Sequence, residues 1–205
     1  MKKLIIIGAG GHGKVVADIA DLLRYEEICF LDDGFQKKCL KYSVAGKVEE
    51  VYKYVKDWEF FVAVGSLPVR EQILGEIELL GGKIATLIHP KAIVAQDVKI
   101  GRGSVVMAGA IINPDTKIGK GVIINTGSSV DHDCVIGDYG HVSVGAHIAG
   151  GVFVGKRCMI GAGATVINGL SICDNCIIGA GAVVVKNLEQ SGTYIGVPAK
   201  MIIDA

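Results

Sequence analysis

The stretch "SVVMAG AIINPD TKIGKG VIINTG SSVDHD CVIGDY", residues 104–139, repeats every six residues, with Ile or Val third in each block. The same register runs without insertion from residue 92 to residue 187, which makes sixteen consecutive blocks. Their third positions are Val94, Ile100, Val106, Ile112, Ile118, Ile124, Val130, Ile136, Val142, Ile148, Val154, Ile160, Val166, Ile172, Ile178 and Val184. One inward branched side chain per block, with Gly, Asn or Asp at the corners, is typical of a parallel β-helix of short strands. Three blocks would form one coil, so we expect slightly more than five coils and, at ~4.8 Å per coil, a prism roughly 25 Å long.

The first position of each block is usually small or branched, as a second inward position in a crowded prism requires. This register places Cys134, Cys158 and Cys176 in the core, with Cys158 and Cys176 stacked one coil apart. The chain has six cysteines, and the spacing of Cys173 and Cys176 also suits zinc. No second ligand pair has a compatible spacing, and disulfides are disfavoured in the cytosol. We therefore expect structural cysteines and no metal site.

Residues 1–89 have a different pattern, in which apolar runs alternate with segments of helical periodicity. The runs predict strands at 3–7, 27–31, 60–64 and 83–88 and helices at 12–24 and 69–80. The first helix should bury a face made of Val15, Val16, Ile19, Leu22 and Leu23. Alternating strands and helices indicate a βαβ-type, Rossmann-like domain with a parallel sheet. We expect this α/β domain at 1–89, the β-helix at 90–187 and a C-terminal tail at 188–205.

Charge and hydropathy exclude several kinds of partner. The chain has 21 basic and 21 acidic residues and no run of like charge, which argues against a nucleic-acid surface or an anionic membrane. The apolar stretch after Lys3 is only about five residues long, too short for a signal-peptide core or a membrane span. We therefore expect a cytoplasmic protein whose partners are small molecules.

The stretch "IIIGAGGHGK", residues 5–14, has the glycine spacing of a nucleotide-binding turn. Glycines at 8, 10 and 13 permit a tight turn, and the following helix N-terminus attracts a phosphate. Asp32 and Asp33 end the next strand, where a carboxylate can bind a ribose hydroxyl or a base edge. Four strands in about 85 residues form one mononucleotide unit, which argues against a dinucleotide. The candidate nucleotide-sugar residues are Gly8, Gly10, Gly11, His12, Gly13, Asp32 and Asp33.

Residues 90–200 resemble the hexapeptide-repeat acyltransferases, and the closing "YIGVPAK", residues 194–200, resembles the end of that family's β-helix beside its coenzyme A site. The resemblance implies a left-handed β-helix, a homotrimer, and acyl-CoA bound between neighbouring prisms. The stretch "GAGGHGKVVAD" followed by "FLDD" is similar to the bacterial nucleotide-sugar acetyltransferases of the PglD and NeuD type. That resemblance implies that the small N-terminal domain holds a nucleotide sugar.

The stretch "NTGSSVDHDC", residues 125–134, contains the candidate catalytic residues. His132 lies at a corner of the repeat, outside the inward register, so packing does not explain it. An imidazole can remove a proton from an attacking amine or hydroxyl, and an adjacent carboxylate orients the ring. Asp133 is that carboxylate, with Asp131 as the alternative. The family's catalytic base is the His of this motif, and the resemblance also places His141 and Asn125 near the acetyl group.

His147 occupies an outward position and is treated as a surface residue. Small residues predict where coenzyme A runs, because they let backbone groups approach the pantetheine. They are Gly145, Ala146, Gly161, Ala162, Gly163, Gly179 and Ala180, with Pro198 in the tail.

The resemblance implies an acetyltransferase that moves acetyl from acetyl-CoA to the amino group of a nucleotide-linked 4-amino-4,6-dideoxy sugar, with UDP as the expected nucleotide. Transfer would be direct, without a metal, in glycan or polysaccharide biosynthesis. Two alternatives are an O-acetyltransferase for sialic acid or another sugar and a non-enzymatic nucleotide-sugar-binding protein. The histidine spacing does not fit a third, the γ-type carbonic anhydrase, because that family uses one close pair of histidines and one distant ligand.

Overall fold

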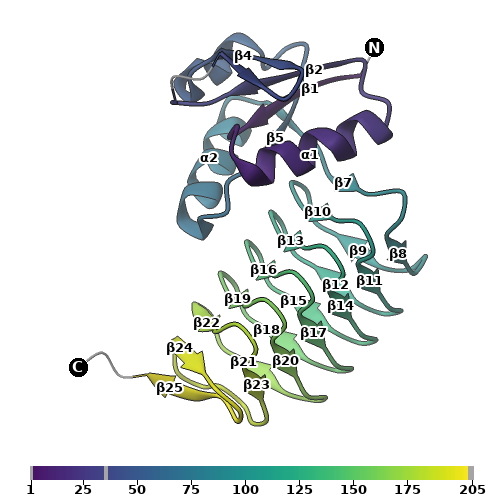
Figure 1. The fold of residues 1–205 in the computed structure, drawn as a ribbon, viewed down its shortest axis with the longest axis vertical. Coiled ribbons are helices and arrows are strands. Elements are labelled where there is room, and N and C mark those ends of the chain that lie inside the picture. The colour runs from purple at the N-terminus through teal and green to yellow at the C-terminus, as the bar shows by residue number, and fades with distance from the viewer. Residues whose placement is uncertain (1, 35–36, 203–205) are drawn as a thin grey trace. The chain divides into compact units, whose positions relative to one another are not determined.

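The structure is a computed structural model that describes residues 2–34 and 37–202, and its chain forms two compact units, Met1–Pro90 and Lys91–Ala205 (Figure 1). The boundary lies one residue beyond the expected one. Residues 203–205 of the expected tail lie outside the described residues. No helix in the described part of the chain is long and apolar enough to cross a membrane.

The first unit is built on a six-stranded sheet with the strand order β3-β4-β2-β1-β5-β6. Its strands are β1 (Lys3–Ile7), β2 (Glu27–Leu31), β3 (Lys38–Cys39), β4 (Tyr42–Gly46), β5 (Glu59–Val62) and β6 (Lys83–Ile84), and β7 (Leu87–Ile88) follows. The helices are α1 (Gly11–Leu22), the 3-10 helix η1 (Val48–Lys53) and α2 (Leu67–Leu79). All pairings are parallel except β3 with β4. The parallel Rossmann-like sheet was predicted, whereas β3, β4 and η1 were not.

The predicted inner face of α1 was partly wrong. Val16 and Ile19 are buried as expected, but Val15 and Leu22 are 43% and 49% exposed. The remaining buried positions are Gly13, Ala17 and Ala20. A Cβ on Gly13 would lie 2.0 Å from the Gly8 carbonyl oxygen, so the start of the helix approaches the end of β1 closely. Small residues therefore face the sheet, and two larger apolar ones point away from it.

The second unit is a parallel β-helix in which each coil spans 18 residues, because strand residues pair with those 18 positions later. The first sheet contains β10 (Val105–Val106), β13 (Ile123–Ile124), β16 (His141–Val142), β19 (Met159–Ile160), β22 (Cys176–Ile178), β24 (Gly192–Ile195) and β25 (Lys200–Ile202). The second contains β8 (Ile93–Val94), β11 (Ile111–Ile112), β14 (Ser129–Val130), β17 (His147–Ile148), β20 (Thr165–Val166) and β23 (Val183–Val184). The third contains β9 (Lys99–Ile100), β12 (Lys117–Ile118), β15 (Val135–Ile136), β18 (Phe153–Val154) and β21 (Ser171–Ile172).

The core of the β-helix confirms the six-residue register. Every third-position residue from Val106 to Val184 is buried, and only Val94 and Ile100, in the first coil, are half-buried. Cys134, Cys158 and Cys176 are also buried, as predicted. The Cys176 backbone N–H donates to Cys158 Sγ at 3.4 Å, which confirms that these two stack in successive coils.

The corners of the prism have their own period. From Gly103 to Gly181 every sixth residue has a positive φ, a conformation that glycine adopts without steric penalty. Five of these positions hold other residues: Asp115, Asp133, Tyr139, Arg157 and Asn175.

We name the three corners by their composition. The small-residue corner follows the first sheet and includes residues 125–127, 143–145, 161–163 and 179–181. The histidine corner follows the second sheet and includes residues 113–115, 131–133, 149–151 and 167–169. The charged corner follows the third sheet and includes residues 101–103, 119–121, 137–139, 155–157 and 173–175.

Candidate active site

The histidine corner holds the pair that the sequence singled out. His132 Nδ1 lies 2.7 Å from Asp133 Oδ2. An ionised carboxylate only accepts hydrogen bonds, so Nδ1 carries the proton and the Nε2 lone pair stays open to a substrate. Asp133 has φ 57°, a conformation that Asp tolerates better than most side chains. The corner conformation thus directs the carboxylate onto the preceding imidazole.

Asp131, the alternative partner, is engaged elsewhere. Its Oδ1 accepts the backbone N–H of His132 at 2.8 Å and the side-chain amide of Asn113 at 2.7 Å. Asp131 therefore fixes the backbone of the corner, and Asp133 is the carboxylate that contacts the imidazole.

Nearby negative charge changes the acidity of the imidazole. The hydrogen bond with Asp133 raises the pKa of His132 above its usual 6.5, and the charges of Asp131 and Asp133 act in the same direction. The His132 side chain is 60% exposed, so burial opposes this shift only weakly. The result is a more basic imidazole that still reaches solvent.

The imidazole lies over Gly150, the residue one coil further along the same corner. A Cβ on Gly150 would be 2.6 Å from His132 Nε2 and 2.7 Å from Cε1. Gly150 is not among the positive-φ glycines, so the space for the ring, rather than the backbone conformation, requires glycine here. The sequence reasoning missed this residue, although adding 18 to 132 would have found it.

His141 and Asn125 form a second polar pair, on the first sheet and at the small-residue corner. Asn125 Nδ2 lies 3.1 Å from His141 Nε2, and Asn125 Oδ1 accepts the backbone N–H of Thr126 at 2.8 Å. Because the amide nitrogen can only donate, His141 Nε2 accepts. Within one chain this pair and His132 belong to different corners of the prism.

Most of the small residues expected to line coenzyme A lie at the small-residue corner. Ala162, Gly163 and Ala180 are exposed. Gly145 is half-buried, and a Cβ there or on Gly163 would meet nothing within 4 Å.

Three other predicted coenzyme A residues are involved in packing within the prism. The Ala146 side chain is fully buried in the core at a first, inward block position, so only its backbone can face a ligand. Gly161 and Gly179 allow close coil packing: a Cβ on Gly161 would lie 2.5 Å from Ile178 O, and one on Gly179 would lie 2.7 Å from the Ile195 side chain. Pro198 is exposed in the C-terminal segment.

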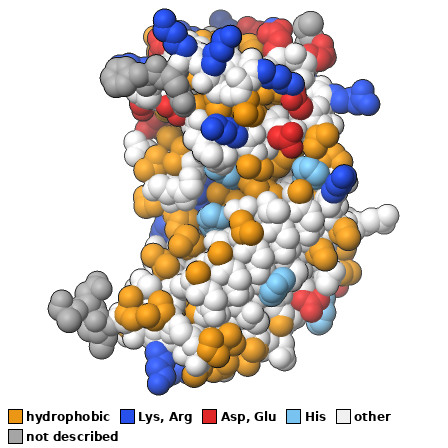
Figure 2. Space-filling view, in the orientation of Figure 1, with side chains coloured by type: hydrophobic (Ala, Val, Ile, Leu, Met, Phe, Trp, Pro, Cys, Tyr) orange, Lys and Arg blue, Asp and Glu red, His pale blue; other side chains and the backbone are white. Residues whose placement is uncertain are grey.

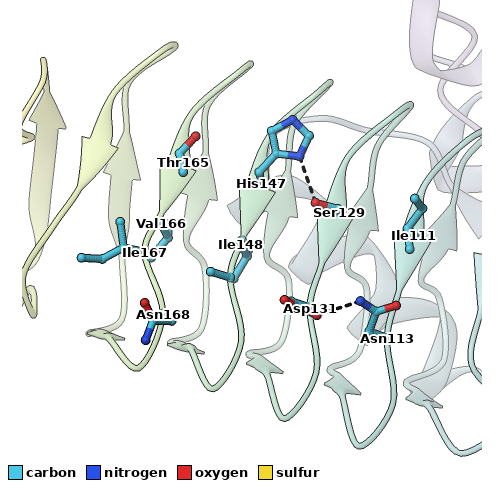
Figure 3. Close-up of a pocket in the computed structure, with 11 residues that line it drawn as sticks. Ile111, Asn113, Ser129, Asp131, His147, Ile148, Thr165, Val166, Ile167 and Asn168 are labelled. Atoms are coloured by element: carbon cyan, nitrogen blue, oxygen red, sulfur yellow. Dashed lines mark hydrogen bonds between the residues drawn. The ribbon is translucent and has the colours of Figure 1, made fainter.

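A groove of about 460 Å³ is lined by the second sheet and by residues of the histidine corner (Figure 3). His147 is exposed there, with Nδ1 2.9 Å from Ser129 Oγ, and Asp131 contacts Asn113 further along the face. The outward residues of this sheet are Ile93, Ile111, Ser129, His147, Thr165 and Val183, so none carries a Lys, Arg, Asp or Glu charge. In the view of Figure 2 the surface of the β-helix shows few charged side chains, whereas that of the first unit shows many.

The glycine-rich turn of the first unit contains two kinds of glycine. Gly8, with φ 100°, and Gly13 are required by close backbone contacts. A Cβ on Gly10 or Gly11 would meet nothing within 4 Å, so these two glycines leave open space beside the start of α1. His12, at the first turn of that helix, is half-buried.

The two acidic residues after β2 hold the turn together. Asp32 Oδ2 accepts the Ala9 N–H at 2.7 Å, and Oδ1 accepts the Gly34 N–H at 2.8 Å. Asp33 Oδ1 accepts the Val48 N–H at 3.0 Å, at the start of η1. Both carboxylates therefore have structural partners, and any contact with a ligand would use their remaining lone pairs.

Arg70 is a buried residue that the sequence reasoning did not single out. Its side chain is fully buried, and Nη1 donates to Val64 O at 2.9 Å and to Gly65 O at 3.1 Å. Burial lowers its pKa to about 10. The guanidinium thus ties α2 to the loop after β5, whose residue Ala63 lies against Gly8 of the glycine-rich turn.

No three His, Cys, Asp or Glu side chains within residues 2–34 and 37–202 converge to hold a metal ion.

Stacked hexapeptide coils with a histidine-carboxylate pair at an open corner, joined to a Rossmann-like unit, define a hexapeptide-repeat acyltransferase with a nucleotide-binding domain. Residues 3–77 match the PglD N-terminal domain, and residues 151–186 match the hexapeptide repeat of succinyl-transferase. The acetyltransferase domain of PglB from Neisseria gonorrhoeae, solved with acetyl coenzyme A, is 40% identical, with a TM-score of 0.96 over 98% of this chain and 99% of that one. The chain belongs to the PglD-type sugar N-acetyltransferases, which use acetyl-CoA, and its β-helix is of the left-handed type.

Two further relatives carry different nucleotide sugars in their names. PerB from Caulobacter crescentus, solved with CoA and GDP-perosamine, is 38% identical, with a TM-score of 0.94 over 98% of both chains. The UDP-N-acetylbacillosamine N-acetyltransferase of Bacillus subtilis is 38% identical in an alignment 118 residues long that covers 53% of this chain. That match spans about half, 52%, of the curated relative's length.

Proposed function

We propose that this protein transfers the acetyl group of acetyl-CoA to the amino group of a nucleotide-linked 4-amino-4,6-dideoxy sugar, with His132 as general base. The observation that carries the proposal is the His132–Asp133 pair, whose Nε2 is open over Gly150. The bound ligands of the Neisseria and Caulobacter relatives support acetyl-CoA and a nucleotide amino sugar as substrates. Because the relatives use UDP- and GDP-linked sugars, the nucleotide is a variable in the test below.

The chemical step is a direct acyl transfer. The sugar nitrogen attacks the thioester carbonyl carbon while His132 Nε2 takes the proton from that nitrogen. The tetrahedral intermediate, whose oxyanion is stabilised by backbone N–H groups, then collapses, the carbon–sulfur bond breaks, and the CoA thiolate takes the proton from the imidazolium. Asp133 stabilises the transient imidazolium and holds its tautomer. No covalent enzyme intermediate is needed.

The separation of the corners supports a homotrimer with the active site between subunits. In one prism His132 and the exposed Ala162 and Ala180 lie at the two corners that flank the second sheet. If three prisms turn this uncharged sheet toward a threefold axis, the histidine corner of each meets the small-residue corner of the next. A closed ring of such heterologous contacts uses both corners of every chain.

The first unit binds the nucleotide in this proposal. The open space at Gly10 and Gly11 allows a phosphate to approach the N-terminus of α1, where backbone N–H groups and the helix dipole favour an anion. The reaction takes place in the cytoplasm, as part of glycan or polysaccharide biosynthesis.

The test measures free thiol released from acetyl-CoA in the presence of UDP-, GDP- and dTDP-linked 4-amino-4,6-dideoxy sugars and of free sialic acid. We expect turnover on a nucleotide amino sugar that falls at least about 10²-fold in His132→Ala and His132→Asn. Lys117→Ala, at an exposed position of the third sheet, is the control that should keep full activity. Turnover on sialic acid alone would replace the proposal with O-acetylation, and full activity in both His132 variants would remove His132 as the base.

Subunit mixing tests the shared site. His132→Ala and Ala162→Trp should each be inactive, the first without a base and the second with its coenzyme A corner blocked. Mixed trimers contain interfaces where an intact His132 faces an intact small-residue corner, so unfolding and refolding the two variants together should restore activity. Lack of restoration in mixed trimers of verified mass would mean that each chain holds a complete site.

A further inference from the structure

The charged corner contains a column of glycines that ends in a cysteine. The fourth positions of its successive blocks are Gly101, Gly119, Gly137, Gly155 and Cys173. A Cβ on Gly137 would lie 2.6 Å from the Gly155 carbonyl carbon, and one on Gly155 would lie 2.6 Å from the Asp174 backbone nitrogen. A side chain at any of these glycines would therefore clash with the next coil. Cys173 is in the last turn of this corner, and its N–H donates to Leu188 O in the segment that follows. A side chain fits here, and it is half-buried.

This side chain meets a second thiol across a tight turn. Asp174 and Asn175 form the turn, with Asn175 at φ 59°, and Cys176 follows at the inward first position of the next block. The two Sγ atoms are 3.5 Å apart. The ends of a β-turn have Cα atoms within about 7 Å, close to the range that a disulfide requires. No other charged-corner turn in the described chain has cysteines at both of these positions.

The neighbouring Cys158 is bound differently. Its thiol donates to Cys173 O at 3.1 Å, and its Sγ accepts the Cys176 N–H at 3.4 Å. Cys158 is fully inside the prism, whereas Cys173 has one side toward solvent. Of these three cysteines, Cys173 is the one that is not fully buried, which makes it the site where we expect a reagent in solution to attack.

We propose that Cys173 and Cys176 are a reversible oxidation site, which a hydroperoxide converts into an intramolecular disulfide. Disulfides in reducing compartments are usually transient and redox-sensing rather than structural, which agrees with a pair that is reduced at rest. The proposal is independent of the acetyl-transfer reaction.

The reaction balances with one hydrogen peroxide. Cys173 gives up its proton and its thiolate attacks one peroxide oxygen, so a sulfur–oxygen bond forms and the oxygen–oxygen bond breaks. The departing hydroxide takes up a proton and leaves as water. The Cys176 sulfur then attacks the Cys173 sulfenic acid, the disulfide forms, and a second water leaves with the Cys176 proton. Two electrons pass from the thiols to the peroxide. Burial and the contact with Cys173 raise the pKa of Cys176, so this thiol is protonated at rest and supplies the proton of the second water.

The test treats the reduced full-length protein with hydrogen peroxide and then titrates thiols after denaturation. We expect the six thiols to fall to four, and dithiothreitol to restore all six. Trypsin together with a protease that cuts before aspartate gives the fragments 158–173 and 174–186, which should be joined by one disulfide. Cys158→Ala should still form this link, and Cys173→Ser should not.

Three outcomes would overturn the proposal. The first is that all six thiols survive in the wild-type protein. The second is that Cys173 reaches the sulfinic acid with no link to Cys176. The third is that the link persists in Cys173→Ser and is lost in Cys158→Ala, which would assign it to Cys158. The thiol titration and the digest of the wild-type protein decide the first two outcomes. The two variants decide the third, because Cys158 and Cys173 lie in the same fragment.

Discussion

Replacing Gly150 with alanine should damage catalysis without damaging the fold. The new Cβ would lie 2.6 Å from His132 Nε2, whereas ordinary carbon contacts begin at 3.4 Å, so the ring must move by about 0.8 Å. That movement takes the ring away from the position in which Nδ1 is 2.7 Å from Asp133 Oδ2. A misplacement of this size in a catalytic group lowers kcat by about 10- to 100-fold.

The assay is thiol release from acetyl-CoA with saturating nucleotide amino sugar, measured across pH. Loss of the Asp133 hydrogen bond should also lower the pKa of His132 toward its usual value, so the acid limb of kcat/KM moves to lower pH. Gly75→Ala, in the middle of α2 with nothing within 4 Å of its Cβ, is the matched control and should leave kcat unchanged. If Gly150→Ala has the kcat and pH profile of the wild-type protein, the base is not the imidazole over Gly150.

Four further variants test Asp133 and the glycine-rich turn of the first unit. Asp133→Asn removes the main cause of the raised pKa of His132, so the acid limb of the kcat/KM profile should move to lower pH and kcat should fall at least about 10²-fold. If the acid limb does not move, Asp133 does not raise the pKa of His132. Gly13→Ala places a methyl group 2.0 Å from a backbone oxygen and should destabilise the first unit by more than about 2 kcal/mol in urea unfolding. In Gly10→Ala the new methyl group contacts nothing in the chain, so this variant should keep the stability of the wild-type protein but bind the nucleotide sugar about tenfold or more weakly. An equal loss of stability in Gly10→Ala and Gly13→Ala would contradict the assignment of Gly13 to packing and Gly10 to ligand binding. Arg70→Met leaves two loop carbonyls without their donor, so we expect a loss of about 2–4 kcal/mol and a higher KM for the nucleotide sugar; an equal rise in the KM for acetyl-CoA would argue against a local effect on the turn.

The β-helix could be predicted from sequence because each residue's direction depends only on its place in a six-residue block. The N-terminal unit was predicted less completely, since β4 depends on its pairing with β2 rather than on any periodicity of its own. The exposure of Val15 and Leu22 depends on how closely α1 approaches β1, and that approach is set by Gly8 and Gly13.

The candidate site was predicted in part for similar reasons. His132 could be singled out because it lies outside the inward register of the repeat. The choice between Asp131 and Asp133 could not be made, because it depends on the left-handed backbone at residue 133. Gly150 is 18 residues from His132 in sequence, so its contact with the ring appears only once the coils are stacked. Ala146 was predicted to line coenzyme A, and its inward block position places its side chain in the core.

The left-handed backbone at the sixth position of each hexapeptide block limits where functional side chains can be placed along a corner. It restricts one residue per corner to glycine or a tolerant polar residue, but the fifth position just before it has no such restriction, and there the chain holds His132, Gly150 and Asn168 in successive coils. Functional groups along one corner are therefore spaced on a fixed scale of about 4.8 Å. Exchanging the His132–Asp133 dipeptide with Gly150–Gly151, together with Asn168→Gly to leave space for the ring, would move the imidazole by one division of that scale while every backbone angle stays allowed. The length of an acceptor could thus be matched by exchanging dipeptides between coils, with no change of fold.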